Sequence, residues 1–162
     1  MLSLSETKTS ATRQLISPVL VCICLALMLL LHWIYPIGLL LRFPFNLAGL
    51  LLSSPGLAIC FMAHLQFKKI GTTLYPFSQP AKLVTGGLFR YTRNPMYLGL
   101  TIFLAGAWLF LGSFSPGILV IAFLLIIDRW YIVHEEQKLM AAFGQAYQAY
   151  QANTPRWIWF TH

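Results

Sequence analysis

The fold is decided by residues 94–127, NPMYLGLTIFLAGAWLFLGSFSPGILVIAFLLII, a stretch that contains no Asp, Glu, Lys or Arg. A bilayer core about 30 Å thick is crossed by roughly 20 apolar residues of helix, so this stretch is long enough for nearly two crossings. Near its middle, the run GSFSPG at residues 112–117 has the composition of a turn. We therefore predict two membrane-spanning helices, over residues 95–111 and 116–133, joined as a tight hairpin.

Two further charge-free stretches precede this hairpin, at residues 14–41 and 43–67, and each is long enough to span a bilayer once. The whole chain of 162 residues is 58% hydrophobic and 9% charged, whereas soluble domains carry about 25% charged residues. This composition excludes an ordinary soluble domain and a disordered chain. We predict an all-α, polytopic membrane bundle with four transmembrane helices, formed by residues 1–162 as one domain.

The distribution of basic residues predicts the orientation, because cytoplasmic loops of membrane proteins are rich in Lys and Arg. With the N-terminus inside, only Arg42 of the 11 basic residues lies outside. Both termini are then cytoplasmic, and the first apolar stretch is a retained helix behind a polar tail of residues 1–13. The basic residues placed on the cytoplasmic side are Lys8, Arg13, Lys68, Lys69, Lys82, Arg90, Arg93, Arg129, Lys138 and Arg156.

Cysteine and histidine spacing does not favour a metal site. The cysteines Cys22, Cys24 and Cys60 all fall within predicted spans and form no C-x-x-C motif, so we expect buried, inert thiols. His32 and His64 also fall within spans, and the chain has no H-E-x-x-H motif. We therefore expect no metal cofactor.

Two segments lie outside the spans. Residues 68–93 are rich in glycine, proline and aromatic residues, which predicts an ordered loop folded over the cytoplasmic mouth of the bundle. After the last span, apolar residues recur at steps of four, four and three, at Leu139, Phe143, Tyr147 and Tyr150. This spacing predicts a C-terminal amphipathic helix, which Pro155 ends. We expect the aromatic tail to anchor at the membrane interface through Arg156, Trp157, Trp159 and Phe160.

The first candidate site is the segment TGGLFRYTRNPMYLG at residues 85–99. The paired glycines permit positive φ and a close approach of a ligand to the backbone. Arg93 stands at a helix start, where Pro95 is well tolerated and free N–H groups can receive an anion. The alternative is a helix-start turn with interfacial Arg and Tyr anchors, which composition and periodicity alone favour slightly.

The second candidate site is the acidic segment at the end of the last span, with Asp128, Arg129, His134, Glu135 and Glu136. Ionisable groups near membrane depth are costly and therefore suggest function. Glu135 lies one turn before Leu139, on the buried face of the amphipathic helix, whereas Glu136 is further from that face. The alternative is a solvated helix start with a Glu135–Lys138 pair, which Glu136 would fit well.

These segments, residues 83–99 with Glu135-Glu136 and the pattern Phe143-Gly144-x-x-Tyr147-x-x-Tyr150, resemble the isoprenylcysteine carboxyl methyltransferase family over residues 67–157. Phospholipid N-methyltransferases share a related core. The resemblance implies a membrane-embedded methyltransferase that holds S-adenosylmethionine in a cytoplasmic pocket formed by the last two spans, the connecting loop and the C-terminal helix. The cofactor-binding residues that it implies are Ala81, Lys82, Leu83, Val84, Gly87, Phe89, Arg93, Asn94, Pro95, Met96, Tyr97, Glu135 and Glu136.

The sequence departs from the eukaryotic enzymes of that family at the acceptor side. Asn94 replaces a histidine, Phe89 replaces a tyrosine, and the arginine that contacts substrate aligns with Tyr131, two residues after Arg129. We expect Arg93, Arg129 and Tyr131 to act on the acceptor. Because arginines attract anions, we expect a lipophilic acceptor with an isoprenylcysteine-type carboxylate or a thiol.

Other functions remain open at this point. A phospholipid N-methyltransferase, an NADPH-dependent membrane reductase and a non-enzymatic scaffold are the alternatives. The short chain resembles bacterial members, so we expect a multi-pass inner-membrane protein that takes its substrate from the bilayer. The basic residues form no dense run, so we expect no nucleic-acid partner.

Overall fold

The computed structural model describes residues 4–70 and 82–158, with side chains for residues 19–69 and 82–158. Residues 71–81 of the predicted loop at residues 68–93 therefore lie outside the described residues. The described residues form helices and no β-strand, which confirms the all-α prediction. The helices are α1 Leu4–Ile34, α2 Ala48–Ile70, α3 Pro95–Leu111, α4 Gly117–Ile126, α5 Val133–Phe143 and α6 Gln145–Asn153, with 3₁₀-helices η1 Phe45–Leu47 and η2 Gly87–Arg90.

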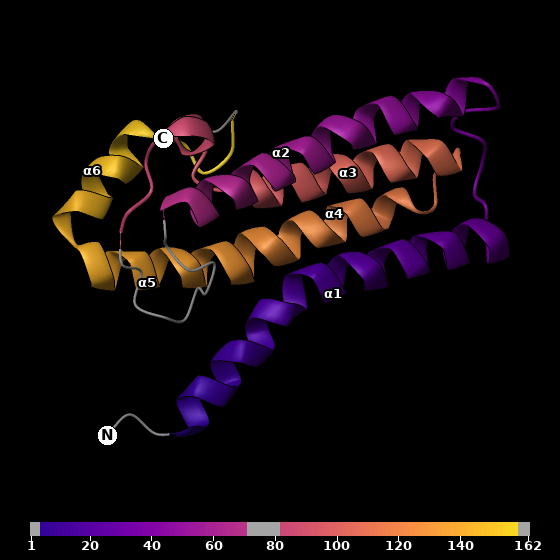
Figure 1. Cartoon of the computed structure of the whole chain (residues 1–162). Coiled ribbons are helices and arrows are strands. Elements are labelled where there is room, and N and C mark those ends of the chain that lie inside the picture. The colour runs from indigo at the N-terminus through magenta and orange to yellow at the C-terminus, as the bar shows by residue number, and fades with distance from the viewer. Residues whose placement is uncertain (1–3, 71–81, 159–162) are drawn as a thin grey trace.

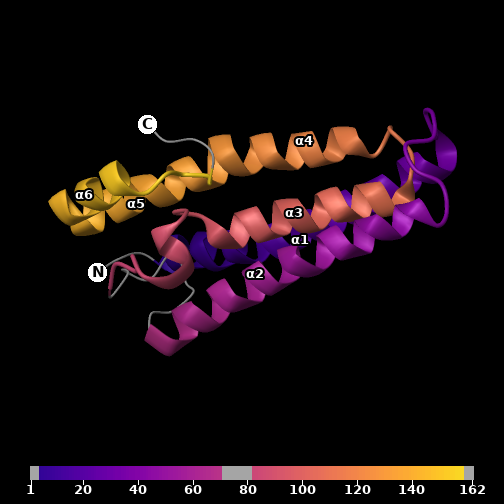
Figure 2. The same ribbon diagram turned by 90° about the horizontal axis from the view of Figure 1, so that it is seen from above.

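The helices α2, α3 and α4 and residues 19–34 of α1 run alongside one another, and α4 continues into α5 through a π-helical segment, Ile127–Ile132 (Figures 1 and 2). Among the described residues, two helices are long and apolar enough to cross a membrane, Phe45–Lys69 and Gly117–Phe143. The apolar helices Val19–Ile34 and Pro95–Leu111 are shorter. The count of four spans and the orientation therefore stay predictions.

The predicted hairpin is confirmed. The helix α3 has the predicted bounds, with Pro95 in its first turn, and it ends at Gly112 in a left-handed conformation, φ 74°. Glycine adopts this conformation without steric cost, so the chain can reverse before α4 begins at Gly117. The second arm runs on past the predicted end at residue 133, because no helix-breaking residue occurs before Gly144.

Glycines let α2 and α3 approach closely. A Cβ atom at Gly56 would lie 2.6 Å from the carbonyl oxygen of Gly99, and one at Gly99 would lie 2.6 Å from that of Gly56. About two helical turns away, Gly49 of α2 faces Gly106 of α3 in the same way. Such small residues bring backbones together and permit dense packing between membrane helices. These contacts fix α3 against the first half of α2.

The connection between α1 and α2 packs on the hairpin turn at the opposite end of the bundle. His32 Nδ1 lies 2.8 Å from Ser113 Oγ, and the backbone N–H of Phe114 donates to the carbonyl of Ile37 at 3.1 Å. These contacts satisfy polar groups of a turn in which Ser113 is fully buried. They tie α1 to the hairpin.

The prediction of one C-terminal amphipathic helix is wrong. Gly144 has φ 50° and ψ −120°, a conformation that only glycine adopts readily, and it separates α5 from α6. The chain therefore turns, and α6 leaves the line of α5 toward η2 (Figure 1). The Tyr150 hydroxyl donates to the carbonyl of Phe89 at 2.6 Å, which docks α6 on η2.

The cysteine prediction is partly wrong. All three cysteines are free thiols, Cys24 is buried and Cys60 is half-buried, but Cys22 is exposed on α1. Residues two apart on a helix point to different faces, so Cys22 and Cys24 cannot both face the bundle.

Candidate active site

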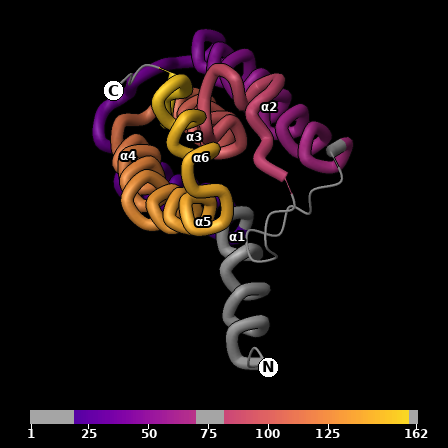
Figure 3. Tube along the Cα trace, turned by 90° about the vertical axis from the view of Figure 1, so that its left-hand side faces the viewer, coloured from indigo at the N-terminus to yellow at the C-terminus, as the bar shows by residue number. Residues whose placement is uncertain are grey.

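The predicted site residues converge at one end of the bundle. There the start of α3, the π-helical segment, α5, α6 and residues 154–157 lie next to one another (Figure 3). We call residues 154–157 the strap. The strap follows α6 and returns to the segment that precedes α3, as the contacts below show.

The centre of this end is a network of charged side chains. Glu136 pairs with Arg93 (Nη1 to Oε1, 3.2 Å) and with Arg156 (Nη2 to Oε2, 2.6 Å). Arg156 also pairs with Asp128 at 3.4 Å, which adds the π-helical segment to the network. The hydrogen bond to Glu136 is the main reason that the pKa of Arg156 is raised above its usual value.

The interpretation of Glu136 as a solvated residue is wrong. Its side chain is 13% exposed, accepts hydrogen bonds from the guanidinium group of Arg156 and forms an ion pair with that of Arg93. The strap covers the position that helical periodicity left open to solvent, because Arg156 comes from a segment 20 residues further along the chain. Glu136 is therefore the carboxylate that joins α5 to the strap and to the start of α3.

The strap is also held through its backbone. The carbonyl of Arg156 accepts hydrogen bonds from Thr92 Oγ1 at 2.8 Å and from Asn94 Nδ2 at 3.3 Å. The carbonyl of Pro155 accepts one from the backbone N–H of Arg93 at 3.0 Å. Asn94 thus precedes α3 as predicted, but its side chain binds the strap rather than capping the helix.

The prediction of an interface anchor is wrong for Arg156 and Trp157. Trp157 is 6% exposed, belongs to the apolar core, and donates its indole N–H to Asp128 at 2.8 Å. A buried indole N–H requires an acceptor, and Asp128 supplies it. Trp159 and Phe160 lie outside the described residues.

The second acid of the pair has a separate partner. The Tyr97 hydroxyl, in the first turn of α3, donates to Glu135 Oε1 at 2.8 Å. Glu135 therefore points toward α3, as its place on the buried face predicted. The two adjacent glutamates thus divide their contacts, with Glu136 bound to arginines and Glu135 to a tyrosine.

The glycine turn before η2 is closed by a side chain from α2. Of the pair, only Gly87 has a positive φ, 60°, and Gly86 is extended. The amide of Gln66 donates to the carbonyl of Gly86 and accepts from the N–H of Leu88 at 3.2 Å. A Cβ at Gly87 would lie 2.5 Å from this amide, so the group that approaches the glycine is Gln66 rather than a ligand.

The predicted cofactor residues around this turn differ in burial. Val84 and Phe89 are buried, and Phe89 packs edge-on against Phe67 with ring centroids 4.8 Å apart. Leu83 and Met96 are half-buried, and Lys82 is exposed. Ala81 lies outside the described residues, and Pro95 is buried at the start of α3.

The three residues expected to act on the acceptor are not equally placed. Arg93 lies in the charged network, whereas Arg129 is 77% exposed and lies 3.8 Å from Asp128 Oδ2. Tyr131 is half-buried and packs against the apolar core. Arg129 therefore reaches the network only through Asp128.

Two tyrosines of α6, Tyr147 and Tyr150, are buried beside Arg93. Burial raises the pKa of Tyr147 to about 12, against the opposing effect of Arg93, and it also raises the pKa of Tyr150. Both side chains are therefore neutral hydroxyl groups at pH 7. The sequence pattern placed them on an amphipathic face without indicating these partners.

Sequence reasoning missed Gln66, Thr92 and the joint role of Asp128 and Arg156. Three of the four acidic residues lie within nine positions of each other, so an excess of negative charge there was visible. That excess calls for basic partners, but the nearest ones along the chain are not those that the fold supplies. Arg156 and Arg93 come from 20 and 43 residues away.

The donor set of this end fits an amino-acid zwitterion such as that of S-adenosylmethionine. Arg93 Nε is buried and has no hydrogen-bond partner among the described residues. A buried guanidinium N–H is costly to leave unpaired, and a carboxylate would satisfy it. Glu135 is an acceptor suited to an ammonium group or to ribose hydroxyls.

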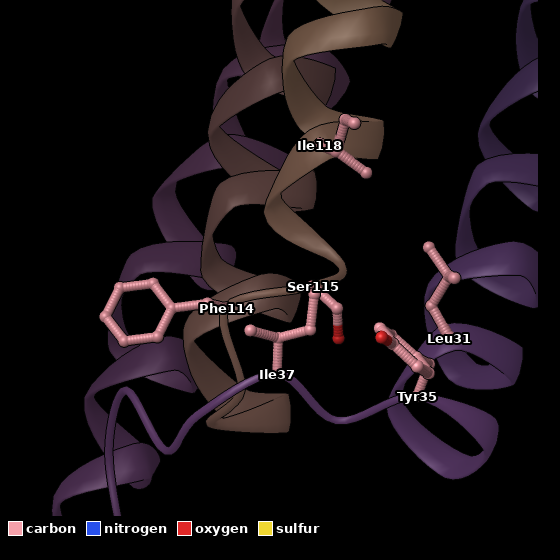
Figure 4. A pocket seen from close by; sticks show the side chains of 6 residues that line it. All are labelled: Leu31, Tyr35, Ile37, Phe114, Ser115 and Ile118. Carbon is pink, nitrogen blue, oxygen red and sulfur yellow. The ribbon is translucent and has the colours of Figure 1, made fainter.

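A separate apolar pocket lies at the other end of the bundle. It has a volume of about 350 Å³ and lies between the end of α1 and the start of α4 (Figure 4). Its lining includes Tyr35, Phe114 and Ile118, and it contains no ionisable acid or base apart from the tyrosine. The described residues also hold no group of three or more potential metal ligands. The charged network is therefore the better candidate for chemistry.

Comparison with known proteins gives a family match on the part of the chain that contains most of the site. The family model described as phospholipid methyltransferase matches residues 45–146. A protein of Schizosaccharomyces pombe named protein-S-isoprenylcysteine O-methyltransferase is 34% identical over 79 residues, which cover 47% of this chain and 32% of that protein. An uncharacterized protein of Haemophilus influenzae is 36% identical over 63 residues, 39% of this chain and 100% of that protein. No solved structure matches.

Proposed function

The chain belongs to the phospholipid methyltransferase family, and we propose that it is an S-adenosylmethionine-dependent methyltransferase that acts on a lipophilic acceptor at the cytoplasmic membrane face. The matched residues 45–146 include Arg93, Tyr97 and both glutamates of the site. The similarity to the yeast methyltransferase covers only a third of that protein's length, so activity and substrate are proposals for this chain.

The observation that carries the proposal is that Arg93 Nε, beside Glu136, has no hydrogen-bond partner in the described part of the chain, in a site that also holds the Tyr97–Glu135 pair. An unpaired donor and a carboxylate on neighbouring elements complement a ligand with one carboxylate and one ammonium group. When bound, S-adenosylmethionine supplies a sulfonium methyl group, whose transfer to an anion neutralises charge and is favoured in a site of low dielectric constant.

The protein's own residues would bind and orient the cofactor and would exclude water from it. Arg93 would hold the carboxylate of the cofactor, and Glu135 its ammonium group or ribose hydroxyls. The buried side chains of Val84 and Phe89 would form an apolar wall. No acid or base is required, because the cofactor carries the reactivity and the protein supplies its position.

An anionic acceptor fits the charges at this end. Arg129 is exposed and Arg156 is partly exposed, so a carboxylate or thiolate would be attracted and an amine repelled. The acceptor's apolar part would stay in the bilayer, beside the exposed apolar side chains of the helices. The preferred substrate is therefore an isoprenylcysteine-type carboxylate or a lipophilic thiol rather than phosphatidylethanolamine.

The proposed topology has four spans with both termini in the cytoplasm. It is supported by the basic residues at the site end, with Lys68 and Lys69 in the last turn of α2, Arg90 in η2 and Arg129 in the π-helical segment, whereas Arg42 lies in the connection between α1 and α2. We propose a bacterial inner membrane as its location, and the similarity to a protein of Haemophilus influenzae supports the bacterial part of this proposal. On this topology the site faces the cytoplasm, where S-adenosylmethionine would be available.

In the test, the purified protein is incubated with S-adenosylmethionine that carries a label in its methyl group. A prenylcysteine analogue, a lipophilic thiol or phosphatidylethanolamine is added as the acceptor. We expect label in the carboxylate or thiol, and we expect the exposed-surface variant Arg90→Gln to behave as wild type. Label in phosphatidylethanolamine alone would overturn the proposed acceptor and leave the proposed methyltransferase activity intact. Absence of binding to S-adenosylhomocysteine in calorimetry would overturn the methyltransferase itself.

A further inference from the structure

We propose that Arg156 is a positioning residue that keeps Arg93 free to bind the carboxylate of the cofactor. This inference rests on the proposed function and extends it to a residue of the strap. Arg156 acts through Glu136, whose carboxylate it shares with Arg93.

The geometry of Glu136 carries the inference. Arg156 binds both oxygens of this carboxylate, with Nη2 at 2.6 Å from Oε2 and Nε at 3.3 Å from Oε1. The closest contact of Arg93 with this carboxylate is an ion pair between Nη1 and Oε1 at 3.2 Å. Arg156 thus forms the two-bond contact, whereas the closest contact of Arg93 is an ion pair made by a terminal nitrogen.

The limited contact explains why Arg93 Nε is unpaired. A guanidinium that faces a carboxylate alone favours two parallel hydrogen bonds, which often use Nε. Because Arg156 already binds both oxygens of Glu136, it competes with Arg93 for this arrangement. Its Nε is left without a partner among the described residues and is available to a second carboxylate.

Arg156 is itself held firmly from the other side. Its Nη1 lies 3.4 Å from Asp128 Oδ1, and its carbonyl accepts hydrogen bonds from Thr92 and Asn94. Trp157 binds the same oxygen of Asp128 at 2.8 Å. The position of Arg156 is therefore set by the π-helical segment and by the loop before α3, independently of Glu136.

The test compares two ligands that differ in the group that Arg93 would bind. S-adenosylhomocysteine has the carboxylate, and 5′-methylthioadenosine lacks the whole amino-acid portion. Isothermal titration in detergent measures both with wild type, Arg156→Gln, Arg156→Lys and the control Arg90→Gln, which removes an exposed arginine at the same end. Thermal unfolding of each variant without ligand reports its folding.

We expect Arg156→Gln to weaken the binding of S-adenosylhomocysteine about tenfold or more. In this variant Arg93 Nε would turn to Glu136, so that one charge-assisted hydrogen bond to the ligand is lost. We expect 5′-methylthioadenosine to bind within about twofold of wild type. Arg156→Lys should lie between, because an ammonium group keeps the charge but cannot form the two-bond contact. If Arg156→Gln does not fold, Arg156→Lys shows the same selectivity on a smaller scale.

The double variant Glu136→Gln/Arg156→Gln provides a second readout. Because Arg156 acts through Glu136, the double variant should bind S-adenosylhomocysteine no more weakly than Glu136→Gln alone. Equal losses for both ligands, or wild-type affinity in Arg156→Gln, would overturn the positioning role while leaving the proposed function. Failure of the wild type to bind either ligand would overturn both.

Discussion

The Tyr97 hydroxyl lies 2.8 Å from Glu135 Oε1, which joins the first turn of α3 to α5 at the end of the bundle farthest from the hairpin turn. The two arms of the hairpin are thus connected at both ends, by the turn at Gly112 and by this hydrogen bond. The bond sets the direction of a carboxylate that helical periodicity only placed on a face. It also makes Glu135 the acceptor whose substitution tests the site most directly.

Glu135→Gln should weaken binding of S-adenosylhomocysteine about tenfold to a hundredfold, because a charge-assisted hydrogen bond contributes about 1.5–3 kcal/mol. Tyr97→Phe keeps the carboxylate and should lower stability by about 1 kcal/mol. Isothermal titration and thermal unfolding in detergent measure the two effects. Wild-type affinity in Glu135→Gln would mean that Glu135 serves the fold alone.

Glu136→Gln should be the more destabilising of the two glutamate substitutions. It removes the charge that Arg93 and Arg156 share, and the loss of hydrogen bonds to charged groups costs about 1.5–3 kcal/mol. Thermal unfolding of Glu135→Gln, Glu136→Gln and wild type under one condition gives the order. A smaller loss in Glu136→Gln than in Glu135→Gln would contradict the network.

Gly87→Ala should destabilise the protein by more than about 1 kcal/mol, because Gly87 has φ 60° and its missing Cβ makes room for the Gln66 amide. Gly86→Ala is the matched control. Gly86 is extended and a Cβ there meets nothing within 4 Å, so stability should change little. Equal melting temperatures for both variants would be inconsistent with a closed turn.

Gly56→Val should separate α2 from α3 and cost about 1–3 kcal/mol, since an overpacked core forces backbone shifts. Even a Cβ would lie 2.6 Å from the carbonyl oxygen of Gly99. Ala58→Val adds bulk on the exposed side of the same helix and should be tolerated. Unfolding in detergent measures both, and comparable losses would show that α2 and α3 do not pack through Gly56.

Cysteine labelling in a background free of native cysteines tests the proposed topology. Arg90→Cys and Phe114→Cys occupy exposed positions at opposite ends of the bundle, whereas Ser113 is fully buried and unsuitable. We expect a membrane-impermeant thiol reagent to label residue 90 from the cytoplasmic side and residue 114 from the other. Labelling of both from one side would refute the hairpin topology.

The sequence by itself determined which segments are apolar helices and where the hairpin turns. A charge-free stretch, the turn at residues 112–117 and Pro95 led to bounds for α3 that agree with the structure. These features depend on hydrophobicity, proline and glycine, which act within a few residues along the chain. The inward direction of Glu135 was also accessible, because it follows from the spacing within one helix.

Only the tertiary structure decided which charged groups meet. Glu136 looked solvated from its own helix, yet Arg156 and Arg93 cover it from 20 and 43 residues away, and Thr92 binds the strap across 64 residues. Such pairings are set by how α6 and the strap fold back after Gly144, a conformation that helical periodicity does not encode. Long-range hydrogen bonds depend on the packed arrangement of several elements, so no local pattern of residues could have paired Asp128 with Arg156 and Trp157.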